Sequence, residues 1–221
     1  MPAPPSPPST SLFLVTPRLS QPDAGAFGKV FAEVLAAGPV ASALVRLAPG
    51  GEAKAIVPPL LAAATARNCA LILEDDARLA ARLGADGVHV SGAGDALDAA
   101  LKSLKPERIV GAGGLRSRDD AMYAGEKGAD YVMFGEPRGA GPAQPLDALL
   151  ERIDWWAEIF ETPCVAYAES VEAAAELARA GADFVALAEA IWDAPSPVAA
   201  SRAVQEALRR VALEKAAEAF R

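Results

Sequence analysis

Charged side chains follow several short apolar runs of this chain, and they are the residues whose types could do chemistry. Arg46 ends one such run, and Glu74 and Asp75 directly follow the next. An arginine at the end of an apolar strand needs an anionic partner, which is either a bound anion or one of these carboxylates. Adjacent carboxylates suit Mg²⁺, although they also favour the start of the helix that follows them. Arg46 is therefore a candidate for binding an anion, with a structural ion pair as the alternative, and the two carboxylates are candidates for binding a cation, with a helix cap as the alternative.

Two weaker signals come later in the chain. His89 is the only histidine, and we expect it to pack at a strand end rather than act as a base, because no nucleophile or orienting group is recognisable. The glycine-rich segment 111–114, which includes Gly113, precedes Arg116 and could cradle a phosphate, although a tight turn gives the same pattern. Arg138 follows a further apolar run and could add positive charge to such a site.

The elements that must position these residues follow a regular couplet of a short apolar run and a longer Ala-rich segment. The runs are typical of strands buried on both faces of a parallel sheet, and they cover residues 12–16, 40–47, 69–73, 86–90, 108–111, 130–134, 163–167 and 183–187. The segments of helical composition are 23–37, 52–67, 76–83, 93–104, 117–127, 145–160, 170–180 and 197–220. Gly-Ala-Asp recurs at residues 84–86, 128–130 and 181–183, where its glycine is expected to end a helix.

Eight such couplets in about 200 residues predict an α/β fold, a single (β/α)₈ TIM barrel over residues 12–221. An open doubly wound sheet is the rival architecture, but the turn after the first run lacks the glycine fingerprint of that fold. Residues 1–11 are rich in proline and serine, and we expect a disordered tail there rather than a signal peptide.

Composition narrows the function classes. The 21 basic and 29 acidic side chains give a net charge of −8, and no run of basic residues offers a nucleic acid a local patch. The sequence contains no uninterrupted stretch of about 18 apolar residues, so we expect no transmembrane helix. Cys69 and Cys164 are expected to be buried thiols, so we expect a cytoplasmic protein. The helix with Trp155 and Trp156 should pack on the barrel or at a subunit interface, which leaves a homo-oligomer open.

Taken together and in order, several blocks of the sequence resemble the thiamine phosphate synthase and TenI family. They are Leu14-Val15-Thr16, Leu44-Val45-Arg46, Glu74-Asp75, Gly84-Ala85-Asp86-Gly87-Val88-His89, Ile109-Val110-Gly111, Gly128-Ala129-Asp130-Tyr131 with Gly135, and Ala186-Leu187-Ala188-Glu189-Ala190-Ile191. The resemblance spans nearly the whole chain after the tail. It implies a barrel that uses magnesium to join a pyrimidine pyrophosphate to a thiazole phosphate, releasing pyrophosphate.

The resemblance also implies roles for individual residues. Arg46 matches an arginine that contacts pyrophosphate, and Asp75 matches a metal-binding aspartate, with Glu74 at the position of a neighbouring asparagine. The second metal-binding aspartate would fall on Gly94, with Asp95 one residue away. Gly113 stands at the position of a serine. The predicted substrate-binding residues are thus Arg46, Gly113, Arg116 and Arg138, and the predicted metal ligands are Asp75, Glu74 and Asp95.

The expected thiazole-phosphate end departs from the family pattern, because Glu136, Glu169 and Glu189 stand where threonine, lysine, glycine and serine residues are expected. Carboxylates there would repel a phosphate dianion. Two alternatives therefore stay open. One is a TenI-like thiazole tautomerase, or another enzyme of phosphorylated heterocycles, in which His89 acts as acid or base. The other is a catalytically silent barrel that binds a ligand or a partner protein.

Overall fold

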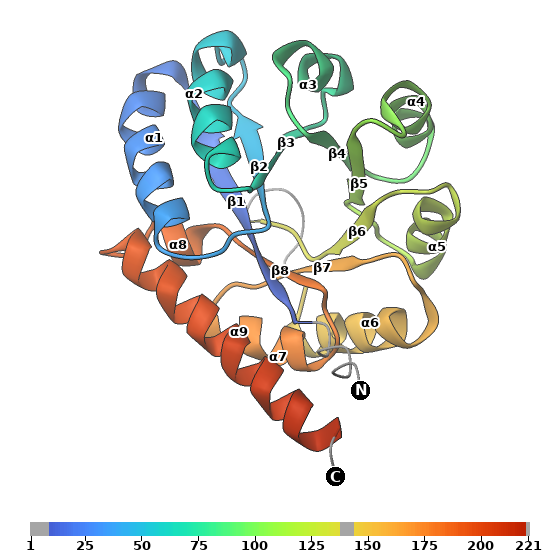
Figure 1. Cartoon of the computed structure of the whole chain (residues 1–221). Coiled ribbons are helices and arrows are strands. Elements are labelled where there is room, and N and C mark those ends of the chain that lie inside the picture. Colours follow the sequence, from blue (N-terminus) through green and yellow to red (C-terminus); the bar gives the residue numbers. More distant parts are fainter. Residues whose placement is uncertain (1–8, 138–143, 220–221) are drawn as a thin grey trace, which may run out of the picture.

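The computed structural model describes residues 9–137 and 144–219, apart from the side chains of residues 22, 23 and 219. Eight parallel strands close into a barrel in chain order, with helices around the outside (Figure 1). The strands are β1 (Ser11–Leu19), β2 (Ser42–Leu47), β3 (Ala70–Glu74), β4 (Gly87–Ser91), β5 (Ile109–Gly113), β6 (Tyr131–Phe134), β7 (Cys164–Tyr167) and β8 (Phe184–Leu187). The predicted (β/α)₈ barrel is confirmed.

The helices lie where the sequence predicts them, with one addition. They are α1 (Gln21–Ala36), α2 (Ala53–Thr65), α3 (Ala77–Leu83), α4 (Asp95–Leu104), α5 (Arg118–Glu126), α6 (Leu146–Ile159), α7 (Val171–Arg179), α8 (Glu189–Trp192) and α9 (Pro197–Ala219). Helix α8 was not predicted, because four residues are too few to show a helical period. Helix α9 runs along the outside of the barrel and contacts α7 and α1, which closes the ring of helices (Figure 1).

Alternation along the strands separates an inner core from an outer one. The inner side chains fill the barrel, and they are Phe13, Val15, Leu44, Ile72, Tyr131, Met133, Val165, Tyr167, Ala186 and Ala188. Their neighbours in sequence, such as Ala43 and Val45, pack outward against the helices. Arg46 follows Leu44 by two residues, and Glu74 follows Ile72 by two. Both charged residues therefore continue the inner rows to the carboxyl end of the barrel.

The three Gly-Ala-Asp motifs each end a helix and bond to the preceding strand in the same way. Their glycines, Gly84, Gly128 and Gly181, have φ angles of 75°, 90° and 109°, so each allows the chain to leave a helix as predicted. The aspartates have a second role that the sequence analysis missed. Each carboxylate accepts a hydrogen bond from a backbone N–H of the preceding strand, Asp86 from Leu71, Asp130 from Val110 and Asp183 from Cys164. The motif thus fixes the register of neighbouring strands.

Residues 1–8 of the predicted tail lie outside the described residues. Near the start of the described residues, the Thr10 hydroxyl donates a hydrogen bond to the Ala182 carbonyl over 2.7 Å. Strand β1 starts at Ser11, one residue before the predicted strand. Both cysteines are buried thiols, as predicted. Trp156 is fully buried, so this part of α6 packs on the barrel. Among the described helices, none has the length and apolar character that crossing a membrane requires.

Candidate active site

The pocket at the carboxyl ends of the strands is the candidate active site, because barrels of this kind carry their reactive groups there. It has a volume of about 400 Å³ and is lined by Arg18, Leu44, Glu74, His89, Ser91, Gly92, Gly114, Arg116, Met133, Glu136 and Pro137. A larger groove of about 980 Å³ lies at the opposite end, beside Thr10, Ser11 and helix α9. That end is built from strand starts, so the smaller pocket is the better candidate.

A local irregularity in β1 places the Arg18 side chain at the pocket. The pairing of β1 with β2 shifts register between Val15 and Arg18, and Pro17 lies within the shift, as expected of a proline inside a strand. At this point the Arg46 N–H donates to the Thr16 hydroxyl over 3.0 Å. After the shift, Arg18 and Arg46 are register partners on adjacent strands, so two arginines stand side by side at the barrel mouth.

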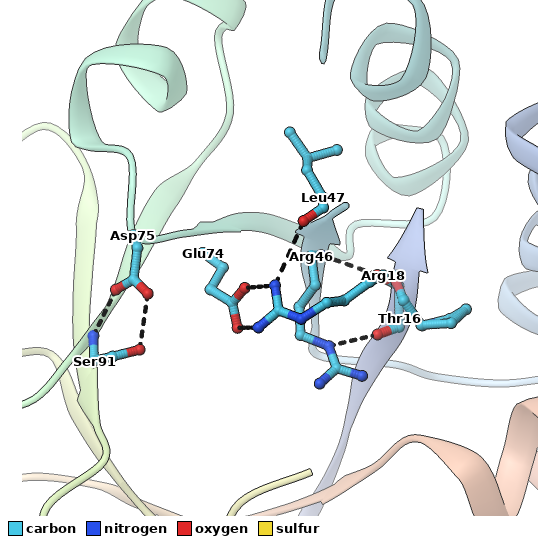
Figure 2. A network of polar contacts seen from close by, with 8 residues as sticks. Thr16, Arg18, Arg46, Leu47, Glu74, Asp75 and Ser91 are labelled. Carbon is cyan, nitrogen blue, oxygen red and sulfur yellow. Dashed lines mark hydrogen bonds and ion pairs between the residues drawn. The ribbon is translucent and has the colours of Figure 1, made fainter. Parts of the chain in front are cut away.

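Arg18 forms an ion pair with Glu74 across the mouth of the pocket (Figure 2). One guanidinium nitrogen lies 2.6 Å from a carboxylate oxygen and the other lies 3.4 Å from the second oxygen. The Arg18 side chain is 49% exposed and that of Glu74 is 15% exposed. Arg18 was not among the predicted site residues, although its place two residues after the first apolar run was a usable signal.

Arg46 is buried, with 4% of its surface exposed, and it has no ion-pair partner among the described residues. The alternative prediction of an ion pair with Glu74 or Asp75 is therefore wrong, because Arg18 binds the Glu74 carboxylate instead. Arg46 Nε donates to the Thr16 carbonyl over 2.8 Å (Figure 2). Burial lowers the pKa of Arg46, the charge of Glu74 opposes that shift, and the charge of Arg18 adds to it.

The two terminal nitrogens of Arg46 have no hydrogen-bond partner among the described residues. The described part of the chain also holds no fully buried side-chain nitrogen or oxygen without a partner. These nitrogens therefore reach open space, where a ligand could meet them. A buried guanidinium with free donors is suited to bind an anion.

Asp75 faces away from this pair. Its carboxylate accepts from the Ser91 N–H over 2.7 Å and from the Ser91 hydroxyl over 2.9 Å (Figure 2). Its backbone is left-handed, with a φ of 56°. The capping role that the sequence suggested for Glu74 and Asp75 belongs to Asp76, whose carboxylate accepts from the Leu79 N–H at the start of α3 over 2.8 Å.

The predicted metal ligands, Asp75, Glu74 and Asp95, are not gathered into one cluster. Glu74 is paired with Arg18, both Asp75 oxygens accept from Ser91, and Asp95 begins α4 without lining the pocket. Within residues 9–137 and 144–219, no group of three or more His, Cys, Asp or Glu side chains is placed to hold a metal ion. Magnesium dependence accordingly stays a prediction from the resemblance, without support from these side chains.

His89 lies in the floor of the pocket, with 5% of its surface exposed. Its Nδ1 lies 2.9 Å from the Tyr131 hydroxyl, and burial lowers its pKa to about 4, so the ring is neutral at pH 7. A side-chain carbon at Gly113 would lie only 2.4 Å from His89 Nε2. Gly113 is therefore small because the histidine ring occupies that space, and a serine does not fit beside it.

This packing corrects the interpretation of the glycine-rich segment 111–114. Residues 111–113 are part of strand β5 and not of a phosphate-cradling loop or turn. A side-chain carbon at Gly111 would lie 2.0 Å from the Tyr131 ring, so this glycine also makes room for a ring inside the barrel. Gly114, with a φ of 63°, is the residue that turns the chain and lines the pocket.

Arg116 lines the pocket together with Glu136, and its substrate-binding role stays a prediction. Glu136 is half-buried, and this burial raises its pKa, while the charge of Arg116 opposes the shift. Arg138, the remaining predicted substrate-binding residue, lies outside the described residues.

The ends of β7 and β8 are acidic, as the sequence indicates. Glu189 is the first residue of α8, and its carboxylate accepts a hydrogen bond from the Tyr167 hydroxyl. Glu169 is exposed, next to Ser170, whose hydroxyl caps α7 by accepting from the Ala173 N–H over 3.1 Å. Loops at this position form the phosphate site of many barrels. Here the carboxylates give the position the opposite charge.

Comparison with known proteins agrees with this architecture. The family model described as thiamine monophosphate synthase matches residues 12–191. A thiamine-phosphate synthase of Rhodospirillum centenum is 41% identical over 86% of this chain and 93% of its own length, and one of Hyphomonas neptunium is 37% identical over 89% and 92%. A thiamine phosphate pyrophosphorylase structure from Pyrococcus furiosus, 24% identical, covers 91% of this chain and 96% of its own with a TM-score of 0.75, which supports the fold. The chain belongs to the thiamine monophosphate synthase family.

Proposed function

We propose that this protein makes thiamine phosphate by joining a pyrimidine pyrophosphate to a thiazole phosphate. The observation that carries the proposal is the 41% identity to a relative named thiamine-phosphate synthase over nearly the whole length of that relative. The mouth of the barrel supports it, because Arg18 and Arg116 line the pocket and the neighbouring Arg46 has free donors that suit the pyrophosphate group of the first substrate.

In the proposed reaction, the bond between the pyrimidine methylene carbon and the pyrophosphate oxygen breaks, and the oxygen keeps the electron pair. The thiazole nitrogen forms the new bond to that carbon. Charge builds up on the departing pyrophosphate, so donors fixed in advance stabilise the transition state. Arg46 supplies such donors, because its buried side chain is held by the Thr16 carbonyl.

The test is turnover by the purified protein supplied with both substrates and magnesium, with thiamine phosphate and pyrophosphate quantified separately. The proposal expects the two products in equal amounts. Pyrophosphate without thiamine phosphate would show hydrolysis, and no product at all would favour a silent barrel. Either result contradicts the proposed function.

A second candidate function, a thiazole tautomerase, is favoured by one observation. His89 is neutral and lines the pocket, and its Nδ1 lies beside the Tyr131 hydroxyl, so the ring is suited to exchange a proton with a ligand in the pocket. Isomerisation of a thiazole carboxylate phosphate that disappears in His89→Gln, while thiamine phosphate formation persists, would assign this activity to the pocket.

A further inference from the structure

The ion pair between Arg18 and Glu74 lines the pocket, and Arg46, which is not among the lining residues, lies next to Arg18 on the adjacent strand. Arg18 and Arg46 are register partners on β1 and β2, and Glu74 ends β3 beside them (Figure 2). Arg18 and Glu74 both line the pocket. Two guanidinium groups therefore lie near the Glu74 carboxylate, and the charge of Glu189 also acts on Arg46.

The ion pair is positioned to open. The Arg18 side chain is 49% exposed, so water screens its attraction to Glu74, and pairs of this kind contribute little to stability. A phosphate oxygen is an equally good acceptor for the guanidinium fork and brings more negative charge. An incoming dianion would also relieve the repulsion between Arg18 and Arg46.

We propose that Arg18 is a second pyrophosphate-binding residue. Without ligand it is paired with Glu74, and the incoming pyrophosphate replaces Glu74 as its partner. Arg18 and Arg46 then bind the pyrophosphate from two adjacent strands, and Glu74 acts as a placeholder for the anion rather than as a metal ligand. This inference rests on the proposed function for the identity of the natural ligand, which carries a pyrophosphate group.

The inference predicts that removing Arg18 and removing Glu74 change the Kd for inorganic pyrophosphate in opposite directions. Arg18→Gln removes a charged donor, so the Kd for inorganic pyrophosphate should rise about tenfold. Glu74→Gln removes the competing acceptor, so the Kd should fall about two- to fivefold. Arg18→Lys keeps the charge without the planar fork and should lie between the wild-type protein and Arg18→Gln.

The experiment is isothermal titration of inorganic pyrophosphate into the full-length protein and these variants, in EDTA and again with excess Mg²⁺, with the melting temperature of each variant recorded. Arg209→Gln and Glu206→Gln are matched controls, because these residues form an exposed ion pair on α9, away from the pocket. Both controls should bind pyrophosphate with unchanged affinity.

Three outcomes would overturn the inference. Weaker binding in both Arg18→Gln and Glu74→Gln, with lower melting temperatures, would show a purely structural ion pair. Weaker binding of Glu74→Gln only when Mg²⁺ is present would make Glu74 a metal ligand. Unchanged binding in Arg18→Gln would exclude Arg18 from the site. Because binding is measured without turnover, a failure to form thiamine phosphate would overturn the proposed function without touching this result.

Discussion

The two sides of the barrel mouth carry different charged side chains on the same scaffold. The ends of β1 to β3 present two arginines, Arg18 and Arg46, beside the carboxylates of Glu74, which pairs with Arg18, and Asp75, which accepts from Ser91. The ends of β6 to β8 are followed by three carboxylates, Glu136, Glu169 and Glu189. The strands beneath are equivalent, since each closes the same barrel with alternating inward side chains. The difference shows that the fold fixes where side chains stand and leaves their charge to the residues just after each strand.

The largest effect should come from removing the buried cation of the basic side. Arg46→Gln is expected to lower kcat/KM for thiamine phosphate formation about 10²- to 10³-fold, because it removes fixed donors from the developing charge on pyrophosphate. Steady-state kinetics measure this loss, and the melting temperature checks that the variant is folded. Arg209→Gln, on the exposed face of α9, serves as the control. A loss of less than threefold would place the pyrophosphate elsewhere.

His89 lies on β4, between the two sides, and it should make stability depend on pH. Its pKa is about 4 in the folded protein, below its ordinary value of 6.5. The unfolded chain therefore binds a proton as the pH falls through 6.5, whereas the folded chain does not until about pH 4. The free energy of unfolding should fall by up to about 3 kcal/mol across that window, and the loss should be complete near pH 4.

Urea unfolding at a series of pH values measures this loss, and His89→Gln provides the comparison. The difference in unfolding free energy between the wild-type protein and His89→Gln should change across pH 4 to 6.5 and stay constant above it. A difference in unfolding free energy that is the same at pH 4 and pH 7 would mean that the His89 ring titrates normally. The pocket would then not hold this ring in its neutral form.

Gly113→Ser should destabilise the protein by about 1 to 3 kcal/mol, because the new side chain meets the His89 ring. The resemblance places a serine at this position, so the variant asks whether the pocket tolerates the family residue. Adding His89→Ala should recover much of the lost stability in thermal unfolding, since it removes the ring that causes the clash. If the two substitutions instead destabilise additively, the close contact does not exist in solution.

The smallest effect should come from the acidic side. Glu189→Gln is expected to lower KM for thiazole phosphate about three- to tenfold, because one like charge near the phosphate is removed. Glu206→Gln on α9 controls for the change in net charge. A rise in KM would mean that Glu189 binds the thiazole substrate directly, and the acidic side would then be a recognition surface and not an obstacle.

Most of the fold could be predicted from the sequence, because its signals are local. The apolar runs and the Gly-Ala-Asp motifs mark each strand and helix end, and the structure follows them. The partner of Arg46 could not be predicted in the same way. The register shift at Pro17 brings Arg18 beside Arg46 and within reach of Glu74, and sequence patterns do not report such a shift.

The prediction for the glycine-rich segment 111–114 was wrong for a related reason. Gly111 and Gly113 are small because the Tyr131 and His89 rings come from neighbouring strands and fill the barrel beside them. Sequence spacing shows a run of glycines, but it does not show which rings face them. Side chains that meet across the barrel interior are therefore the part of this site that needed the structure.

A crystal structure of the protein with inorganic pyrophosphate tests the central claim most directly. The account predicts pyrophosphate at the ends of β1 and β2, with phosphate oxygens within hydrogen-bond distance of both Arg18 and Arg46, and with Glu74 no longer paired to Arg18. Pyrophosphate bound at the ends of β7 and β8, or bound with the Arg18–Glu74 pair intact, would contradict it.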